Sequence, residues 1–432
     1  QKAIELEEPI KFHGTGAQNA LVIDQFNEYD FPIAEEKGGA ELHMIWTDTP
    51  CRITCWNYGH KTELAMRNPK IECIVAQHPW LENDCLYADI ILPANTFMEV
   101  DDILTNIRQG TQQPNIMIAD KAIEPIGESK SDAEIVLEVS KKFDDLEEDL
   151  TDGMTIRDMQ KKIWEYMGGE KLVSWEQLWE KKYWVYNTAE DWEDDVPGFR
   201  NFYEDPEKSP LATPTGKLEF YSESLAKRFP DDKERPPIPK WIEKSHNHDE
   251  RLSSHRAKMF SMLMMSNHGR WRVHAQCDDI TWTREAPTGK IMGPDGYNYE
   301  PCWLHTSEAE KRGIRHGDIV KIYNERGIVL GGAYVTERLR PGVVYMDHGA
   351  RHDPIKTGEI ERGGAINTIT PEAITSENCV GQIGGGYLVE VARVTGEEWD
   401  RWRREHPEAF ERKYDPAAGL RVDAWLEGGE RR

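Results

Sequence analysis

Imidazole, guanidinium and thiol groups crowd into one short stretch of the chain, NHGRWRVHAQCDD at residues 267–279. His268, His274 and Cys277 are of the types that ligate zinc. The arginines on either side of Trp271 are of the types that contact nucleic acid. A third interpretation is a loop that holds the phosphates and rings of a large anionic cofactor, because arginine forks onto phosphate oxygens. The surrounding sequence has to decide among the three.

Composition argues against two broad classes of protein. The 432 residues carry a formal net charge of -25, whereas nucleic-acid binding needs a basic surface, so no nucleic-acid partner is expected. No apolar run approaches the roughly 20 residues that span a bilayer, and no transmembrane segment is expected. In so acidic a chain, a local basic cluster indicates a specific anion rather than a general affinity for polyanions.

The seven cysteines lack the pattern of a metal or disulfide framework. No pair is spaced as CxxC, and the nearest two are Cys51 and Cys55. We therefore expect reduced thiols, and neither a structural zinc nor an iron–sulfur cluster within these residues. The chain begins at Gln1 without an initiator methionine. We expect a piece of a longer protein, cytoplasmic or alternatively periplasmic.

The first part of the chain has the pattern of a parallel sheet. Apolar runs at 42–48, 71–77 and 85–94 are separated by a short helical segment and polar turns. Polar residues follow directly after the strands, as in sheets that bind ligands at their carboxyl edge. The expected fold class is an α/β parallel-sheet domain, placed at residues 1–150 as part of a dinucleotide-binding domain.

A helical connecting region rich in tryptophan is expected at 151–250. Helical patterns cover 132–143, 156–167 and 174–184, and the acidic segment 144–153 between them is interpreted as a solvated linker. Tryptophans at helical spacing indicate a core or a domain interface rather than a cofactor site.

Beyond residue 250 the sequence changes character. Short β-rich runs between Gly-Asp, Asn-Glu-Arg-Gly and Arg-Pro-Gly turns at 317–349 predict a compact closed β-barrel. A helix at 307–313, capped by Thr306, precedes these runs. The barrel domain is placed at 251–395 and a charged helical tail at 396–432.

Two motifs lie before the barrel. The first, IVAQHPWLENDCLYADIILPANTFMEVDD at 74–102, has a Gln after a strand, then Tyr-Ala-Asp, Leu-Pro-Ala and Glu at fixed spacing. The second, LATPTGKLEFYSESL at 211–225, reads as a Thr-Pro turn that leads into a strand. Each alone has an ordinary structural interpretation.

Two further motifs lie in the barrel region. MLMMSNHGRWRVHAQCDDITWTRE at 262–285 contains the opening stretch after a strand, and GGAINTITPEAITSENCVGQIGGGYLVEV at 363–391 is rich in amides and glycines. Glycines at 363–364 and 384–386 are expected to let the backbone approach a planar ligand. In this order, the four motifs resemble the molybdopterin-dinucleotide oxidoreductases of the dimethyl sulfoxide reductase family. The chain differs from many members at His78, where they carry Asp, and at 83–85.

The resemblance implies a six-stranded barrel of the double-psi type and a bis-molybdopterin guanine dinucleotide cofactor with molybdenum or tungsten. The residues implied to bind it on the sheet are Thr47, Asp48, Gln77 and His78. Those implied on the barrel are Ser266, Asn267, His268, Arg270, Arg272, His274, Gln276, Asn367, Asn378 and Gln382. Catalytic side chains and metal ligands are implied to lie upstream of Gln1. An iron–sulfur cluster is implied either upstream of Gln1 or in a partner subunit.

Within the family, TDTPCRITCWN at 47–57 is similar to the subgroup of pyrogallol–phloroglucinol transhydroxylase, acetylene hydratase and catechol dehydroxylases. The similarity implies a catalytic subunit that moves a hydroxyl group between polyhydroxylated aromatics, with a small aromatic polyol as substrate and an iron–sulfur electron-transfer subunit as partner. Reductive dehydroxylation and hydration are alternatives. Two other classes stay open: a cofactor-less structural homologue, and a zinc or nucleic-acid module built on 267–279.

Overall fold

The computed structural model describes residues 43–81, 83–105, 115–144, 146–187, 190–191, 198–244, 247–278, 289–372, 374–376, 379–411, 413–415 and 420–422. Contacts group the chain into two compact units, one of residues 1–91 and 242–432, the other of residues 92–241. The boundary expected near 250 falls close to a junction of these units. The boundary expected at 150 falls inside the second unit, so residues 92–150 group with the helical region.

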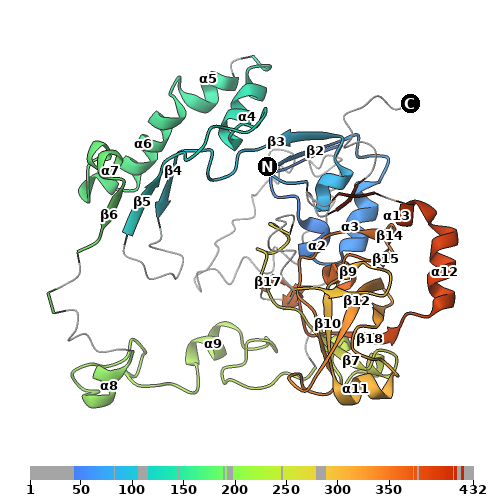
Figure 1. The fold of residues 1–432 in the computed structure, drawn as a ribbon. Helices are drawn as coiled ribbons and strands as arrows, with labels where there is room; N and C mark the ends of the chain where they lie inside the picture. The colour runs from blue at the N-terminus through green and yellow to red at the C-terminus, as the bar shows by residue number, and fades with distance from the viewer. Residues whose placement is uncertain are drawn as a thin grey trace, which may run out of the picture. The chain divides into compact units, whose positions relative to one another are not determined.

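A three-stranded sheet opens the first unit, in the order β1-β2-β3 (Figure 1). Its strands are Met44–Thr47 (β1), Cys73–His78 (β2) and Ile90–Pro93 (β3), and β1 runs parallel to β2. β2 is buried along nearly its whole length, which explains its unbroken apolar run. The helices of this part are α2 (Arg52–Cys55), α3 (Gly59–Met66) and the 3-10 helix η2 (Asn83–Tyr87). The predicted parallel-sheet domain is confirmed.

Six strands of the same unit close into a barrel (Figure 1). They are Met262–Met265 (β7), Pro301–His305 (β10), Ile319–Asn324 (β11), Gly327–Thr336 (β12), Val343–Tyr345 (β13) and Tyr387–Arg393 (β18). Neighbours follow the order β10-β13-β7-β18-β11-β12, and β12 pairs back onto β10 to close the ring. Pairing is parallel for β10–β12 and β13–β7 and antiparallel elsewhere in the ring. The predicted closed six-stranded barrel is confirmed.

Apolar side chains from all six strands fill the barrel. β11 shows the reason in its alternation, because Val320 and Ile322 face inward between half-buried neighbours. The 3-10 helix η7 (Ile366–Ile369) adds Ile366 and Ile369 to the same core. Shorter strands of the unit are Ile291–Met292 (β8), Asn298–Tyr299 (β9), Pro354–Lys356 (β14), Ile360–Glu361 (β15), Ile374–Ser376 (β16), Cys379–Gln382 (β17), Lys413–Asp415 (β19) and Leu420–Val422 (β20).

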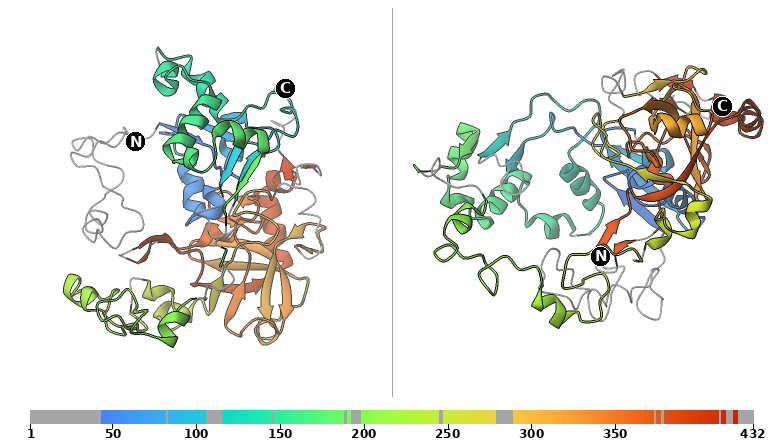
Figure 2. Two further views of the ribbon diagram at one scale, coloured as in Figure 1. Left: turned by 90° about the vertical axis from the view of Figure 1, so that its left-hand side faces the viewer. Right: turned by 90° about the horizontal axis from the view of Figure 1, so that it is seen from below.

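Helices pack on the outside of the barrel. The helix expected at 307–313 is α11 (Thr306–Lys311), but its cap is His305, whose ring nitrogen accepts the Ser307 N–H, rather than Thr306. The tail forms α12 (Gly396–Glu405) and α13 (Pro407–Glu411), which lie beside the barrel strands in Figure 2. Trp402 and Ala409 join a core cluster with Tyr299 and Leu330. Two 3-10 helices, His248–Glu250 (η5) and His255–Lys258 (η6), precede β7.

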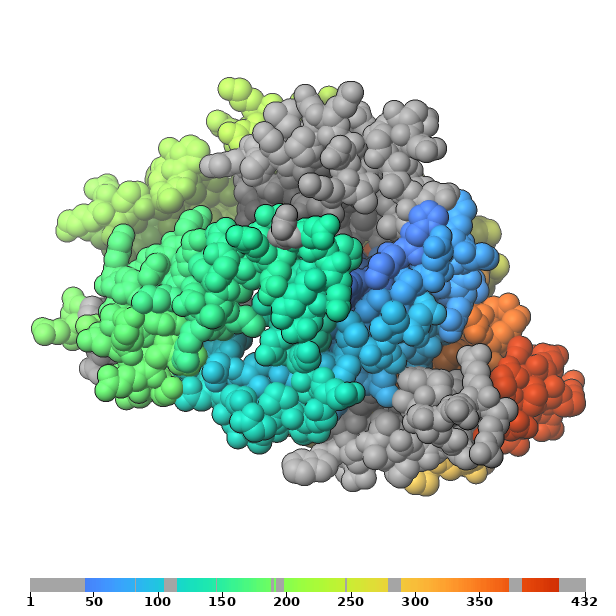
Figure 3. All heavy atoms as spheres, turned by 90° about the horizontal axis from the view of Figure 1, so that it is seen from above, coloured from blue at the N-terminus to red at the C-terminus, as the bar shows by residue number. Residues whose placement is uncertain are grey.

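The second unit combines a small sheet with helices, seen as the teal and green surface of Figure 3. Its antiparallel strands are Asp102–Thr105 (β4), Asn115–Ala119 (β5) and Tyr183–Val185 (β6). Its helices are Asp132–Ser140 (α4), Leu146–Thr151 (α5), Ile156–Tyr166 (α6), Gly169–Lys171 (η3), Trp175–Lys181 (α7), Arg200–Glu204 (α8) and Glu223–Arg228 (α9). Trp164 and Trp175 lie in its core, as the tryptophan pattern predicted.

Three local expectations in the second unit were wrong. The segment 144–153, interpreted as a linker, contains α5, whose first turn holds three acidic residues that favour a helix N-terminus. The helix expected to 184 ends at Lys181, because Lys182 turns left-handed and the next residues pair with β5. No strand forms within 211–225, where turns lead into α9.

Every helix that the structure describes is too short or too polar to span a bilayer.

Candidate functional site

Helix α2 carries Cys55, and two buried polar side chains fix its ends. The carboxylate of Asp84 accepts hydrogen bonds from the backbone N–H of Arg52 at 2.8 Å and of Ile53 at 3.1 Å. At the other end, Nδ2 of Asn367 donates to the carbonyl of Cys55 at 2.9 Å. A helix of a single turn has little cooperative stability of its own. The position of Cys55 is therefore set by bonds from distant parts of the chain.

Arg272 anchors the opening stretch to the barrel. Its Nη1 lies 2.9 Å from the carboxylate of Glu300, while Nε donates to the carbonyl of His348 at 2.8 Å and Nη2 to that of Asp347 at 3.1 Å. Burial opposes the charge, but Glu300 and Asp278 raise the pKa of Arg272 above its ordinary value. Most of its N–H groups thus bond to protein, so we interpret it as a support for the loop more than as a phosphate contact.

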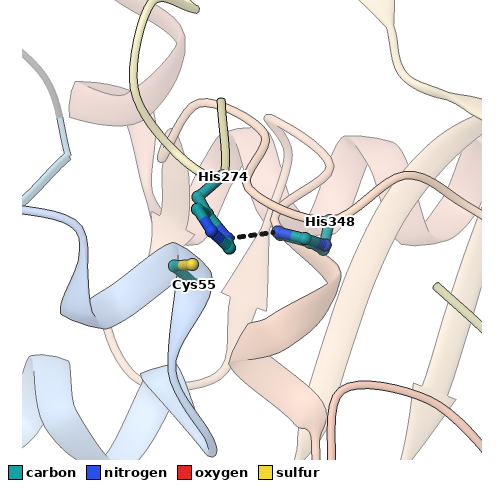
Figure 4. Close-up of side chains that lie close together, drawn as sticks. All are labelled: Cys55, His274 and His348. Carbon is teal, nitrogen blue, oxygen red and sulfur yellow. Dashed lines mark hydrogen bonds between the residues drawn. The ribbon is translucent and has the colours of Figure 1, made fainter. Parts of the chain in front are cut away.

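Two imidazoles and one thiol meet beside this loop. Nδ1 of His274 lies 3.2 Å from Nε2 of His348, and the sulfur of Cys55 faces the same gap (Figure 4). The donor atoms of the three side chains all lie within 4.8 Å of one another. The ring of His268 packs edge-on against His274 and His348, with centroids 4.4 and 4.6 Å away. The cluster joins α2, the loop after β7 and the loop after β13.

The negative charge of this cluster lies on Cys55. A hydrogen bond from the Cys51 thiol and another from His348 lower the pKa of Cys55 to about 4, against the effect of its burial. The same bond to Cys55, together with burial, raises the pKa of Cys51. Burial and the neighbouring imidazoles lower the pKa of His268. At neutral pH the site therefore presents a thiolate next to imidazole nitrogens.

The backbones of the two histidine loops touch. Gly349 adopts a φ of +74°, and a Cβ at this position would lie 1.8 Å from the carbonyl oxygen of His274. His274 itself has a φ of 55°, a left-handed conformation that costs energy for a residue with a side chain. Only glycine permits this approach, so the spacing of the two imidazoles depends on Gly349.

A buried amide ties η2 to both loops. Nδ2 of Asn83 donates to the carbonyl of Ala275 at 2.8 Å, and its Oδ1 accepts the backbone N–H of His352 at 3.1 Å. Asp278 accepts the backbone N–H of Arg351 at 3.0 Å. The segment 83–85, where the chain departs from the family pattern, therefore contributes to positioning the loops.

The sheet residues implied to bind cofactor lie together where β1 and β2 end. Thr47, Gln77 and His78 are all buried, and Asp48 is exposed just after β1. Oε1 of Gln77 accepts from the indole of Trp46 at 3.1 Å. The structure thus brings these four residues to the carboxyl edge of the two parallel strands, the edge at which such sheets bind ligands.

Two implied barrel residues hold buried oxygen atoms that have no hydrogen-bond partner among the described residues. They are Oγ of Ser266 and Oδ1 of Asn367. Leaving a buried polar atom unpaired costs roughly 1–3 kcal/mol, so such atoms indicate an external partner. Hydroxyl and amide oxygens suit the mixed donor and acceptor edge of a pterin. This donor set fits a molybdopterin dinucleotide.

The structure gives no common location to the other residues implied to bind cofactor. Arg270 is exposed, 5.2 Å from the ring of Trp271, and Gln276 pairs through its backbone with Val273. Asn267 is exposed, and its carbonyl accepts the N–H of His348. Asn378 lies outside the described residues, as does the side chain of Gln382, whose backbone belongs to β17.

Two glycines of the turn at 363–364 pack closely against other parts of the protein. A Cβ at Gly363 would lie 1.9 Å from the carbonyl oxygen of Arg351, and one at Gly364 would lie 2.3 Å from the side chain of Glu300. Close packing against protein thus requires glycine at both positions, and the expectation that residues 363–364 approach a planar ligand stays a prediction. A Cβ at Gly384 would meet open space, so that part of the expectation stays a prediction.

Sequence reasoning missed Cys55 and His348 as partners of His274. Cys277, which first suggested a metal, is outside the donor cluster. Cys55 lies more than two hundred residues before either histidine, so no local spacing could reveal the three donors. The only available signal was that TDTPCRITCWN and the opening stretch both belong to the same family pattern.

Comparison with protein families agrees with this architecture. Residues 34–142 match the molybdopterin oxidoreductase family, and residues 262–382 match the molybdopterin dinucleotide-binding domain. The first range covers the parallel sheet, and the second covers most of the barrel with both histidine loops. The chain therefore belongs to the molybdopterin oxidoreductases.

Individual relatives are distant. The chain is 28% identical to the pyrogallol hydroxytransferase large subunit of Pelobacter acidigallici over 90% of its length and 47% of that protein. It is 31% identical to trimethylamine-N-oxide reductase 1 of Escherichia coli K12 over 76% of its length and 38% of that protein. Acetylene hydratase from Pelobacter acetylenicus shares the fold, with a TM-score of 0.54 at 16% identity over 81% of this chain and 44% of that one. The chain spans less than half the length of these relatives.

Proposed function

We propose that this chain is the cofactor-binding part of the catalytic subunit of a bis-molybdopterin guanine dinucleotide enzyme. The observation that carries this proposal is the pair of buried oxygens without partners on Ser266 and Asn367, inside the segment that matches the dinucleotide-binding domain. Ser266 and Asn367 would bind one pterin edge, and Thr47, Asp48, Gln77 and His78 would receive a dinucleotide at the sheet edge. When bound, the cofactor supplies a molybdenum or tungsten centre that acts as a Lewis acid and two-electron carrier.

We further propose that the reaction moves a hydroxyl group between polyhydroxylated aromatics. The similarity to a pyrogallol hydroxytransferase large subunit extends over 90% of the chain and supports this choice. That relative is named as a large subunit, which supports a second subunit as partner here. We propose that this partner is an iron–sulfur electron-transfer subunit. The chain's own contribution is to orient the cofactor and to keep the cluster of His268, His274 and His348 beside it.

The reaction class follows from whether an external reductant is needed. Transfer of a hydroxyl between two aromatics is redox-neutral overall, whereas reductive dehydroxylation and N-oxide reduction consume two electrons. The test incubates the purified full-length enzyme with pyrogallol and a tetrahydroxybenzene, and follows phloroglucinol by chromatography. We expect phloroglucinol to form without a reductant. Formation only with a reduced viologen would indicate a dehydroxylase, and acetaldehyde formed from acetylene would indicate a hydratase; either result would contradict the proposed reaction.

The cofactor assignment is tested by Ser266→Ala. The Oγ of Ser266 has no hydrogen-bond partner among the described residues. The substitution should therefore leave the free energy of unfolding of the cofactor-free protein unchanged or raise it slightly. It should also lower the pterin content of purified enzyme. Pterin is measured by fluorescence after oxidation.

Ser254→Ala is the matched control, because the Oγ of Ser254 donates to the carbonyl of Asp249 at 2.9 Å. This control should destabilise the fold by roughly 1 kcal/mol and retain pterin. Equal pterin content in wild type and Ser266→Ala would remove the assignment of Ser266.

A further inference from the structure

We infer that Cys55, His274 and His348 form a protein-ligated site for a borderline divalent transition-metal ion such as Zn²⁺, separate from the metal of the molybdopterin cofactor. The three donors lie within 4.8 Å of one another, and Figure 4 shows them facing a common gap. This inference does not depend on the proposed function. It concerns an ion bound by three side chains of this chain, and no cofactor atom is among its ligands.

The distances suit tetrahedral coordination. With zinc–nitrogen bonds of about 2.0–2.1 Å, tetrahedral geometry places two ligand nitrogens roughly 3.3–3.4 Å apart. Nδ1 of His274 and Nε2 of His348 are already 3.2 Å apart. In the absence of an ion, that short contact requires one imidazole to donate a proton to the other. An ion would replace this proton and bond both nitrogens.

The donor chemistry selects the class of ion. Among the described residues, the cluster offers one sulfur and two imidazole nitrogens and no carboxylate. Such donors suit zinc, copper, nickel or cobalt and disfavour magnesium and calcium. A cysteine sulfur is the soft ligand that these ions prefer. His274 is exposed while His348 is buried, so a fourth position can take water or a substrate atom. Three protein ligands with one open position is the arrangement of catalytic rather than structural zinc.

The surrounding residues hold the donors in place before any ion binds. Arg272 bonds to the carbonyl of His348 while lying two residues before His274 in the chain, so it fixes both imidazole loops. Asn367 and Asp84 hold the two ends of the helix that carries Cys55. Metal sites with such outer support commonly lose 10–100-fold in affinity when a support is removed. Three surface side chains that were close only by chance would not be expected to have such hydrogen-bonded supports.

The test measures metal in the purified full-length enzyme. After treatment with a weak chelator and gel filtration, elemental analysis should find about one zinc per chain beside the molybdenum or tungsten. Replacement with Co²⁺ should give the near-ultraviolet charge-transfer band of a cobalt–thiolate bond and visible bands of tetrahedral cobalt. A wild-type protein that binds no zinc and gives no cobalt–thiolate band overturns the inference, whatever the behaviour of the variants.

Variants locate the ion. Cys55→Ser, His274→Ala and His348→Ala should each weaken Zn²⁺ binding by more than about 100-fold. Cys277→Ser is the matched control, because it removes a thiol from the same loop but outside the cluster, and it should retain the ion. Retention of zinc in Cys55→Ser, or loss in Cys277→Ser alone, would contradict the assignment.

Pterin content, measured in the same samples, separates this inference from the proposed function. Loss of zinc with pterin retained supports the ion site. Loss of pterin with zinc retained would mean that the cluster contacts the cofactor instead, and it would overturn the inference while leaving the proposed function intact. If no sample contains pterin, the proposed function fails and the zinc measurement still stands.

Discussion

Two arginines of one loop, Arg270 and Arg272, show how residue type alone leaves a role open. Both were implied as cofactor contacts by the same motif. Arg270 is exposed, whereas Arg272 is buried and bonds to Glu300 and to two backbone carbonyls. The distinction depends on Glu300, which no local pattern connects to the loop.

At the residue scale, we predict that Arg272→Met destabilises the fold by roughly 3–5 kcal/mol, because it leaves the buried carboxylate of Glu300 with a weaker set of partners. Lys290 also contacts Glu300, so the destabilisation should lie toward the lower end of this range. Arg270→Met should change the unfolding free energy by less than about 0.5 kcal/mol. Chemical denaturation of both variants measures the difference, and equal stability would contradict the anchoring role of Arg272.

At the scale of elements, the site depends on two loops that meet backbone to backbone. The loop after β7 and the loop after β13 touch at Gly349, where a side chain would collide with the carbonyl of His274. The loops therefore form one structural unit although their residues are about seventy positions apart.

We predict that Gly349→Ala destabilises the protein more than Gly342→Ala. Both glycines have positive φ, so both substitutions carry the backbone strain of roughly 1–2 kcal/mol. A Cβ at Gly342 meets nothing within 4 Å, while one at Gly349 lies 1.8 Å from a carbonyl oxygen. The collision should add about 1–3 kcal/mol. Thermal unfolding of the two variants is the measurement, and similar values would show that the loops separate without cost.

Many helix starts and barrel strands could be predicted, because the sequence signals for them are local. The helices expected from 132 and 156 begin at those residues, each with a capping box, at Ser131 and Thr155. The β-rich runs between turns predicted the barrel strands, of which β11 is one. The sequence could not predict the cap of α11 by His305, which depends on a side-chain rotamer, or the end of α7 at Lys181, which depends on the left-handed turn of Lys182. The cluster of Cys55, His274 and His348 could not be predicted, because its members come from distant segments that meet only in the folded first unit.

At the scale of the whole first unit, a buried charge network links α3 to the barrel loops. Glu63 of α3 lies 3.1 Å from Nε2 of His352, and both side chains are fully buried. Burial alone would lower the pKa of His352, but the Glu63 carboxylate raises it above its ordinary value of 6.5. Burial also acts on Glu63, yet the charge and hydrogen bond of His352 lower its pKa. The pair is therefore ionised at pH 6, which lies below the raised pKa of His352 and above the lowered pKa of Glu63.

This network predicts a pH dependence of stability with a definite sign. Above pH 6.5 the unfolded chain loses its imidazole proton before the folded chain does, so the contribution of His352 is complete below pH 6.5 and is lost as the pH rises through its raised pKa. Glu63→Gln should therefore destabilise the fold most near pH 6, by roughly 3 kcal/mol, and less at pH 9. Denaturation across this range measures the effect.

Glu72→Gln is the matched control for that experiment. Glu72 pairs with His43 at 2.9 Å, but both side chains are exposed, so the substitution should have no measurable effect at any of these pH values. A cost of Glu63→Gln that grew toward pH 9 would contradict the assignment of a charged His352.

The central claim is that this chain binds a bis-molybdopterin guanine dinucleotide. The most direct measurement is the content of molybdenum or tungsten, pterin and guanosine monophosphate in the purified full-length protein after acid release. The account predicts one metal, with two pterins and two guanosine monophosphates, for each protein chain. Protein that is folded and full-length but contains neither metal nor pterin would contradict it and would favour a structural homologue without the cofactor.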